Sequence, residues 1–349
     1  MERSKTAPLD LEFFEFDEGT FERVEDGLLC LMDHSNRWRS LKLRGYDHPH
    51  ITLPPAFRQL RGHLSNLQHF LLHYSWRNAD MVSFTSDLDI LSECPLLTSI
   101  ELKIQNPLFN PHFPWSQIQS LKLAHCGLSQ VRRTLASCNN LKRLELSYFL
   151  SGPITTLDQL RCLSVERLLD DEFFHFFQSY NLPSLSHLKI RDGCLDLHFL
   201  ETFLNCSSCS ITSLNLGLLR LSDVDLLHLL TLVPNLTTFS YEEYSEPMLR
   251  SEGRPMNQVV TTTFLQQLVL DSGDEHSTRF LPQLEDLTLT IYPLENSGRQ
   301  ALQHMLASRS TGQLRKFTLA VREVEKQVSD YESLQCFRDV GIQIHLWLT

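Results

Sequence analysis

A six-residue phrase, Leu-x-x-Leu-x-Leu, recurs along this chain and constrains its fold more than any other feature. Its clearest copy places Leu141, Leu144 and Leu146 between charged residues. Twelve copies, some with Ile, Phe, Val, Trp or Tyr in place of Leu, follow one another at a mean spacing of about 25 residues, a period typical of stacked repeats. The middle apolar residues of the twelve copies are Leu41, Phe70, Ile100, Leu121, Leu144, Leu163, Leu188, Leu214, Phe239, Leu268, Leu287 and Phe317.

Each copy has the alternation of a short strand, and several of the intervening segments have the spacing of a helix. Leu128, Val131 and Leu135, for example, are three and four residues apart. A strand that returns through a helix lies parallel to its predecessor, with a right-handed crossover. The sequence therefore predicts an α/β fold, a leucine-rich-repeat solenoid or horseshoe of about twelve repeats, with a parallel sheet on the inner, concave side and helices outside.

The repeats also predict the organisation of the chain. Residues 1–36 read as an acidic N-terminal segment, solvated up to about residue 19, followed by a capping helix that begins after Thr20. Residues 37–349 read as the solenoid, closed by a last strand around residues 340–344. Two stretches interrupt the rhythm: a proline-rich connector at 106–115 and a polar loop at 242–257.

Composition excludes several classes of protein. The net charge of −11 disfavours a nucleic-acid binder, whose affinity comes from clustered Lys and Arg. No apolar run approaches the roughly 18 residues of a membrane span, and no secretory signal precedes the acidic segment. The nine cysteines follow no disulfide spacing, which favours free buried thiols in a reducing compartment. We therefore expect a cytoplasmic or nuclear protein that binds neither nucleic acid nor membrane.

The helix-to-strand joints resemble those of a known family. The segment 34–43 resembles the first repeat of the fungal F-box/leucine-rich-repeat proteins, and residues 94–97, 138–141 and 233–236 resemble their joints. The resemblance covers about residues 28–349. It implies a substrate-recognition part of an SCF-type ubiquitin ligase, whose F-box docks on the Skp adaptor. The residues ahead of Thr20 are too few and too acidic for an F-box, so we expect that adaptor as a partner only if a box lies upstream of Met1.

Strand alternation turns the residues between the repeat leucines outward, onto the predicted concave face. Charges of both signs occur there in the first seven repeats, whereas the last five repeats carry small neutral residues. We expect a protein partner to bind this charged part and the chain to be a monomer outside that complex; a merely solvated face is the alternative. The candidate partner-binding residues are Lys42, Arg44, Glu101, Lys103, Lys122, Glu145, Lys189 and Arg191.

Catalytic and metal-binding motifs are not found in the sequence. It contains no H-E-x-x-H, G-x-S-x-G or phosphate-binding glycine loop, so we expect no enzyme and no cofactor. Cys206 and Cys209 form a lone C-x-x-C, which reads as two reduced thiols because structural zinc needs two further ligands. The alternative function is a repeat-built regulator of a GTPase, or an inhibitor-like binding protein with no ubiquitin link. Its only candidates for a finger residue are Arg250 and Arg254.

Overall fold

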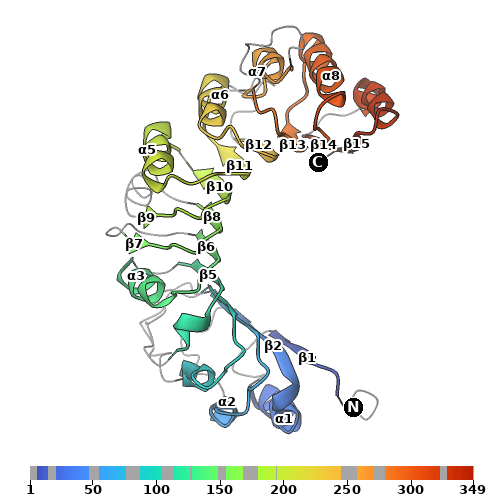
Figure 1. Ribbon diagram of the computed structural model, residues 1–349. Helices are drawn as coiled ribbons and strands as arrows, with labels where there is room; N and C mark the ends of the chain where they lie inside the picture. Colours follow the sequence, from blue (N-terminus) through green and yellow to red (C-terminus); the bar gives the residue numbers. More distant parts are fainter. Residues whose placement is uncertain are drawn as a thin grey trace. The chain divides into compact units, whose positions relative to one another are not determined.

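The computed structural model describes residues 6–14, 21–46, 55–75, 87–103, 113–125, 128–147, 155–167, 180–193, 195–244, 258–270, 280–322 and 328–348. The chain divides into two compact units, Met1–Arg161 with Ser179–Asn181, and Cys162–Gln178 with Leu182–Thr349. In each unit, parallel strands follow one another in chain order and helices cover one face of the sheet (Figure 1). This α/β arrangement of parallel strands and outer helices was predicted from the repeats, and it fits a solenoid.

The first unit contains six neighbouring parallel strands. They are β1 (Leu9–Phe14), β2 (Trp38–Tyr46), β3 (His69–Ser75), β4 (Ser99–Lys103), β5 (Ser120–Ala124) and β6 (Arg143–Ser147). The connections contain the helices α1 (Phe21–Met32), α2 (Pro55–Arg58) and α3 (Leu128–Ser137), and the 3₁₀ helices η2 (Ser35–Arg37), η3 (Asp87–Leu91) and η4 (Trp115–Gln117). A separate pair of two-residue strands is formed by β7 (Thr155–Thr156) and β9 (Tyr180–Asn181).

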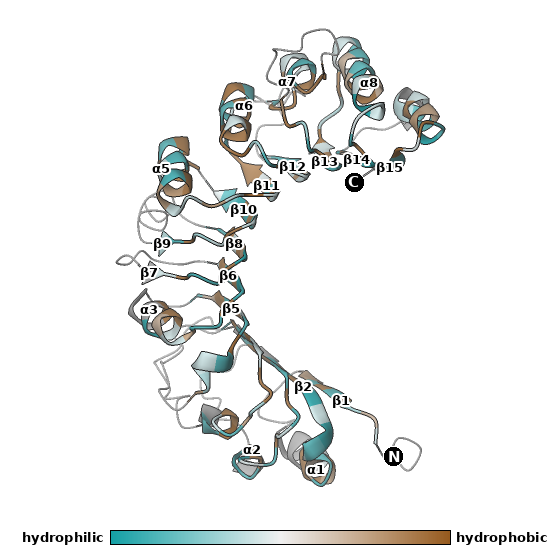
Figure 2. Ribbon diagram, in the orientation of Figure 1, coloured by the Kyte–Doolittle hydropathy of each residue, from teal (hydrophilic) through white to brown (hydrophobic). Residues whose placement is uncertain are grey.

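The second unit contains seven neighbouring parallel strands. They are β8 (Cys162–Glu166), β10 (His187–Gly193), β11 (Ser213–Leu219), β12 (Thr238–Glu243), β13 (Asp286–Ile291), β14 (Lys316–Val321) and β15 (Gln343–Leu348). The helices of its described residues are α5 (Leu197–Ser207), α6 (Asp223–Thr231), α7 (Thr262–Gln267) and α8 (Asn296–Ser310), with the 3₁₀ helix η5 (Val328–Arg338) before the last strand. Figure 2 shows the mixture of hydrophobic and hydrophilic residues along α5 and α8 that burial of one helix face requires.

The core is built from the repeat residues. Leu121 and Leu123 of β5 are at most 3% exposed, whereas Lys122 between them is half-buried on the other face of the sheet. The register places Leu121 beside Ile100 of β4 and Leu144 of β6, so the apolar residues of successive strands form continuous rows. Burial of a Leu or Ile side chain contributes about 1.5 to 3 kcal/mol. The predicted inward and outward assignment is confirmed for this strand and its neighbours.

Asparagines connect the joints of successive repeats. Asn66 donates through Nδ2 to the carbonyl of Asn36, 2.6 Å away, and Asn140 donates to the carbonyl of Ser116 at 2.7 Å. Asn235 donates in the same way to Ser210 Oγ at 3.2 Å. These bonds satisfy polar groups where the chain turns into each strand, which gives the recurring Asn of the joint a structural role.

The prediction for the N-terminal segment was wrong for residues 9–14. Instead of a solvated lead-in, they form β1, which pairs in parallel with β2. Its acidic residues lie on the face of the sheet that carries basic residues: Asp10 forms an ion pair with Arg39, and Glu12 lies 2.8 Å from Arg44. The capping helix that was expected after Thr20 is α1, where Leu28 is fully buried.

The tenth copy of the phrase, around Leu268, is not a strand, so that prediction was wrong. Residues 262–267 form α7, and β12 pairs directly with β13. The backbone carbonyl of Leu268 instead accepts a 2.6 Å bond from Nε of the buried Arg309, whose terminal nitrogens bind the carbonyls of Leu281 and Phe280 at 3.0 and 2.9 Å. Burial lowers the pKa of Arg309 to about 10.

The buried carboxylate of Glu243 binds backbone groups in the connection between β12 and β13 and just after β13. Glu243 is 1% exposed and accepts bonds from the backbone N–H groups of Val259, Val260 and Tyr292 at 2.7 to 3.0 Å. Burial raises the pKa of Glu243, although these donors favour its charged form. The sequence suggested an exposed loop from residue 242, but Glu242 and Glu243 belong to β12; residues 245–257 lie outside the described residues.

Other predictions have mixed outcomes. Ser222 caps α6 in a capping box with Asp225. The closing strand exists, but β15 begins at Gln343 rather than near residue 340. The cysteines are not all buried, because Cys30, Cys206 and Cys336 are exposed while Cys94 and Cys138 are buried. Most of the proline-rich connector, 106–112, lies outside the described residues.

Adjacent residues of β6 should differ sharply in their contribution to stability. Leu144→Ala removes a side chain that is 1% exposed and should reduce the free energy of unfolding by about 2 to 5 kcal/mol. Glu145→Ala changes a half-buried residue on the opposite face and should change it by less than about 0.5 kcal/mol. Urea unfolding of both variants measures the difference, and equal losses would refute the assignment of faces.

The three carbonyls around Arg309 give a second prediction. Arg309→Met leaves them without their donor and should lower the free energy of unfolding by about 3 kcal/mol or more. Arg309→Lys should recover only part of this, because one ammonium group cannot reach three acceptors placed for a guanidinium. Arg315→Met, at an exposed position, is the matched control for urea unfolding. A loss no larger than that of the control would contradict the role of Arg309.

Candidate functional site

The face of each sheet opposite the buried rows, here called the open strand face, carries polar side chains in register. In the first unit the strand pairing sorts them into three rows that run across β1 to β6. The amino row is Asp10, Ser40, His69, Ser99, Ser120 and Arg143. The middle row is Glu12, Lys42, Leu71, Glu101, Lys122 and Glu145. The carboxyl row is Phe14, Arg44, His73, Lys103, Ala124 and Ser147.

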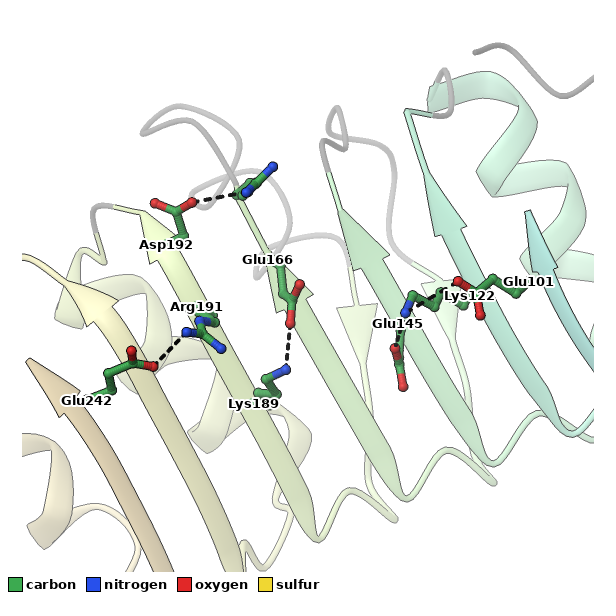
Figure 3. A network of polar contacts seen from close by, with 9 residues as sticks. Glu101, Lys122, Glu145, Glu166, Lys189, Arg191, Asp192 and Glu242 are labelled. Atoms are coloured by element: carbon green, nitrogen blue, oxygen red, sulfur yellow. Dashed lines mark hydrogen bonds and ion pairs between the residues drawn. The ribbon is translucent and has the colours of Figure 1, made fainter. Parts of the chain in front are cut away.

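Charges in the middle row neutralise one another across neighbouring strands. Lys122 lies between two carboxylates, with Nζ 3.5 Å from Glu101 and 3.3 Å from Glu145 (Figure 3). Burial alone would lower the pKa of Lys122, but the two carboxylates outweigh it and the pKa is raised. At the first strand, Glu12 lies 4.0 Å from Lys42. These pairs are more than a quarter exposed, so each contributes at most about 1 kcal/mol to stability.

The open strand face of the second unit carries a different set of pairs. Lys189 Nζ lies 2.5 Å from Glu166, and Arg191 Nη2 lies 2.8 Å from Glu242 (Figure 3). Arg191 and Glu242 are on strands separated by β11, where the register places Gly217 between them. A Cβ atom on Gly217 would lie 3.3 Å from Glu242 Oε2 and 3.4 Å from Arg191 Cγ, so the small residue leaves room for this pair. Glu242 also forms an ion pair with Arg322.

All eight predicted partner-binding residues lie on the open strand faces and are half-buried. Seven of them take part in the ion pairs described above. Lys103 is the exception, since it has no ion pair within the described residues. The structure therefore brings Lys42, Arg44, Glu101, Lys103, Lys122 and Glu145 together in the first unit and Lys189 with Arg191 in the second. Their role in binding stays a prediction.

Sequence reasoning missed several members of these faces. Asp10, Glu12 and Phe14 were assigned to a solvated segment, although their alternation with Leu9, Leu11 and Phe13 could have indicated a strand. Glu242 was placed in a loop, although it continues the alternation of β12. The expectation of small neutral residues holds for Asn215, Ser240, Thr288 and Thr318 but fails at Val269, which is not on a strand, and at Glu242.

The pKa of His73 depends on its burial and on the charges around the carboxyl row. Its pKa is lowered, first by burial and then by the positive charges of Lys103 and Arg44 on the two neighbouring strands. Glu101 opposes this effect, and His125, which follows β5, adds to it. Because desolvation and nearby cations both disfavour the imidazolium, His73 is held neutral in the folded protein more firmly than in a free peptide.

The structure adds no support for the other candidate sites, which are the C-x-x-C pair, a metal site and a GTPase-directed finger. Cys206 lies in the last turn of α5 and Cys209 just beyond it, and both are free thiols. No group of three or more His, Cys, Asp or Glu residues arranged for a metal ion occurs in the part of the chain that the structure describes. Arg250 and Arg254, the candidates for a GTPase-directed finger, lie outside the described residues.

Comparisons with known proteins do not identify the chain. No protein-family model matches it, and no curated protein matches it. Among the helices within the described ranges, none has the length and apolar character needed to cross a bilayer.

The lowered pKa of His73 predicts a pH-dependent stability. Below a pH of about 6.5 the unfolded chain takes up a proton at this imidazole more readily than the folded chain, so the wild-type protein should lose stability relative to His73→Gln as the pH falls from 7.5 to 5.5. Urea unfolding at several pH values measures this difference. In a Lys103→Gln background the effect of His73→Gln should depend less on pH, because one of the opposing cations is gone. An unchanged difference between wild type and His73→Gln over this range would contradict the environment described for His73.

Proposed function

We propose that this chain is a leucine-rich-repeat recognition scaffold that binds a segment of another protein on its open strand faces. The observation that carries the proposal is the set of half-buried polar side chains held in register on neighbouring parallel strands of the first unit. Side chains fixed to a sheet lose little additional freedom on binding, so contacts with a partner cost less entropy than contacts made by a loop. Solenoid repeats commonly use such extended surfaces for recognition.

The ion pairs within the open strand faces would help the chain to discriminate between partners rather than to bind many partners tightly. Each pair is partly solvated and weak, so a partner that offers matching charges can replace or extend it at little cost. A partner with the wrong charge pattern would leave carboxylates or ammonium groups unpaired, which costs several kcal/mol when the interface excludes water. The alternation of Glu101, Lys122 and Glu145 is therefore suited to choosing between partners.

A narrower form of this proposal is substrate recognition for an SCF-type ubiquitin ligase in the cytoplasm or nucleus. It rests on the resemblance of the joints at residues 94–97, 138–141 and 233–236 to those of the fungal F-box/leucine-rich-repeat proteins. Its test is separate: the chain, extended upstream of Met1 where its transcript allows, should copurify with a Skp-type adaptor. Failure to recover the adaptor would remove the ligase role and leave the scaffold role standing.

A photo-crosslinking residue tests the scaffold role itself. Placed at Ser164, on the open strand face of the second unit, or at Ser99 in the first, it should capture a defined protein from the native lysate. The same residue at Arg133, which is exposed on α3, is the control and should not capture that protein. Equal capture at the helix position, or none at the strand positions, would contradict the proposal.

Charge reversal then tests the predicted residues. With the captured partner purified, Lys122→Glu and Lys189→Glu should each weaken binding by about tenfold or more, because each removes a cation from the proposed interface. Lys122→Met and Lys189→Met separate the loss of the charge from repulsion by neighbouring carboxylates. Unfolding midpoints of all four variants show whether the fold is kept. Affinities unchanged in all four variants would exclude the open strand face as the binding surface.

A further inference from the structure

The charges on the open strand face of the first unit are separated by row. Among the described residues, all of its carboxylates lie in the amino and middle rows, at Asp10, Glu12, Glu101 and Glu145. The carboxyl row contains Arg44, His73 and Lys103 on three successive strands and no acidic residue. A chain with a net charge of −11 thus presents two cations, Arg44 and Lys103, on either side of a histidine at one edge of a sheet face.

The cations of this row are only partly neutralised. Arg44 shares Glu12 with Lys42, and its guanidinium lies 5.9 Å from the ring centroid of Phe14, which is 58% exposed. Lys103 has no ion pair among the described residues, and the neighbouring Glu101 is engaged by Lys122. Both cations also act on His73 between them, where they add to the lowering of its pKa that burial causes.

We infer that the carboxyl row of the first unit binds an acidic segment of a protein partner, with one carboxylate at Arg44 and another at Lys103. This inference deepens the proposed recognition function and rests on it. Phe14 supplies an apolar contact beside the first carboxylate, a combination that distinguishes a peptide from a simple anion.

Strand spacing sets the pattern of the acidic segment. Arg44 and Lys103 are two strands apart, or about 9.6 Å at the usual separation of neighbouring strands. A peptide in the polyproline II conformation advances about 3.1 Å per residue with three residues per turn, so acidic residues at positions i and i+3 lie on one side of it about 9.3 Å apart. A segment that crosses the strand ends can therefore place one carboxylate at each cation while its intervening residues pass over His73.

Poly-L-glutamate is a suitable probe because the acidic chain as a whole repels it, so any binding reports a local basic site. The full chain should bind it at 50 mM salt, more weakly at 200 mM, and Lys103→Glu should weaken binding by about tenfold or more. Glu101→Gln should strengthen binding severalfold, because it removes a carboxylate two residues from Lys103 on the same strand. Arg133→Glu, the same charge reversal on α3, should stay within about twofold of the wild type.

Synthetic peptides test the spacing and the class of ligand. A peptide with glutamates at i and i+3 should bind more tightly than one with the same composition and adjacent glutamates. Binding of inorganic phosphate with no binding of either peptide would overturn the inference in favour of a phosphate site. Equal affinity of wild type and Lys103→Glu for poly-L-glutamate would also overturn it. Capture of a partner at Ser99 or Ser164 would then show that the recognition function survives without this site.

Discussion

The structure depends on the apolar rows that run beneath the strands. Leu41, Phe70, Ile100, Leu121 and Leu144 occupy one register position on five successive strands, and each is at most 2% exposed. Because side chains of a strand alternate between the two faces, burying this row also fixes the residues that turn outward. A shift of one residue in any strand would expose its core side chains, so hydrophobic burial determines the register of the polar rows.

The outward residues form their ion pairs as a consequence of that register. Glu101, Lys122 and Glu145 are more than 20 residues apart in sequence, yet they meet because their inward neighbours stack. The same holds for Arg191 and Glu242, which additionally need Gly217 on the strand between them. The pairs themselves add little stability. They form a defined pattern of charge on the open strand faces.

Much of the fold could be predicted from the sequence, because the core repeats with a nearly constant period. Strands β2 to β6 appear where the phrase predicts them. The strand β1 was missed because Asp10 and Glu12 gave the segment an acidic composition, and their basic partners are known only once the pairing with β2 is known. The copy around Leu268 failed for another reason: Arg309, some 40 residues later, binds the backbone carbonyl that a strand would have used.

The candidate site could be located but not characterised from the sequence. Alternation identified the outward residues correctly, including Lys103 and Arg44. It could not show that most of them are already paired, or that Lys103 has no ion pair within the described residues, because pairing depends on contacts between strands. The most direct test of the central claim is a double-mutant cycle on the register neighbours Leu102 and Leu123. Stacked rows predict a coupling energy of at least about 0.5 kcal/mol between Leu102→Ala and Leu123→Ala, but additivity within about 0.3 kcal/mol for Leu102→Ala with Leu146→Ala, two strands away. Additivity of the adjacent pair would contradict the stacking on which both open strand faces depend.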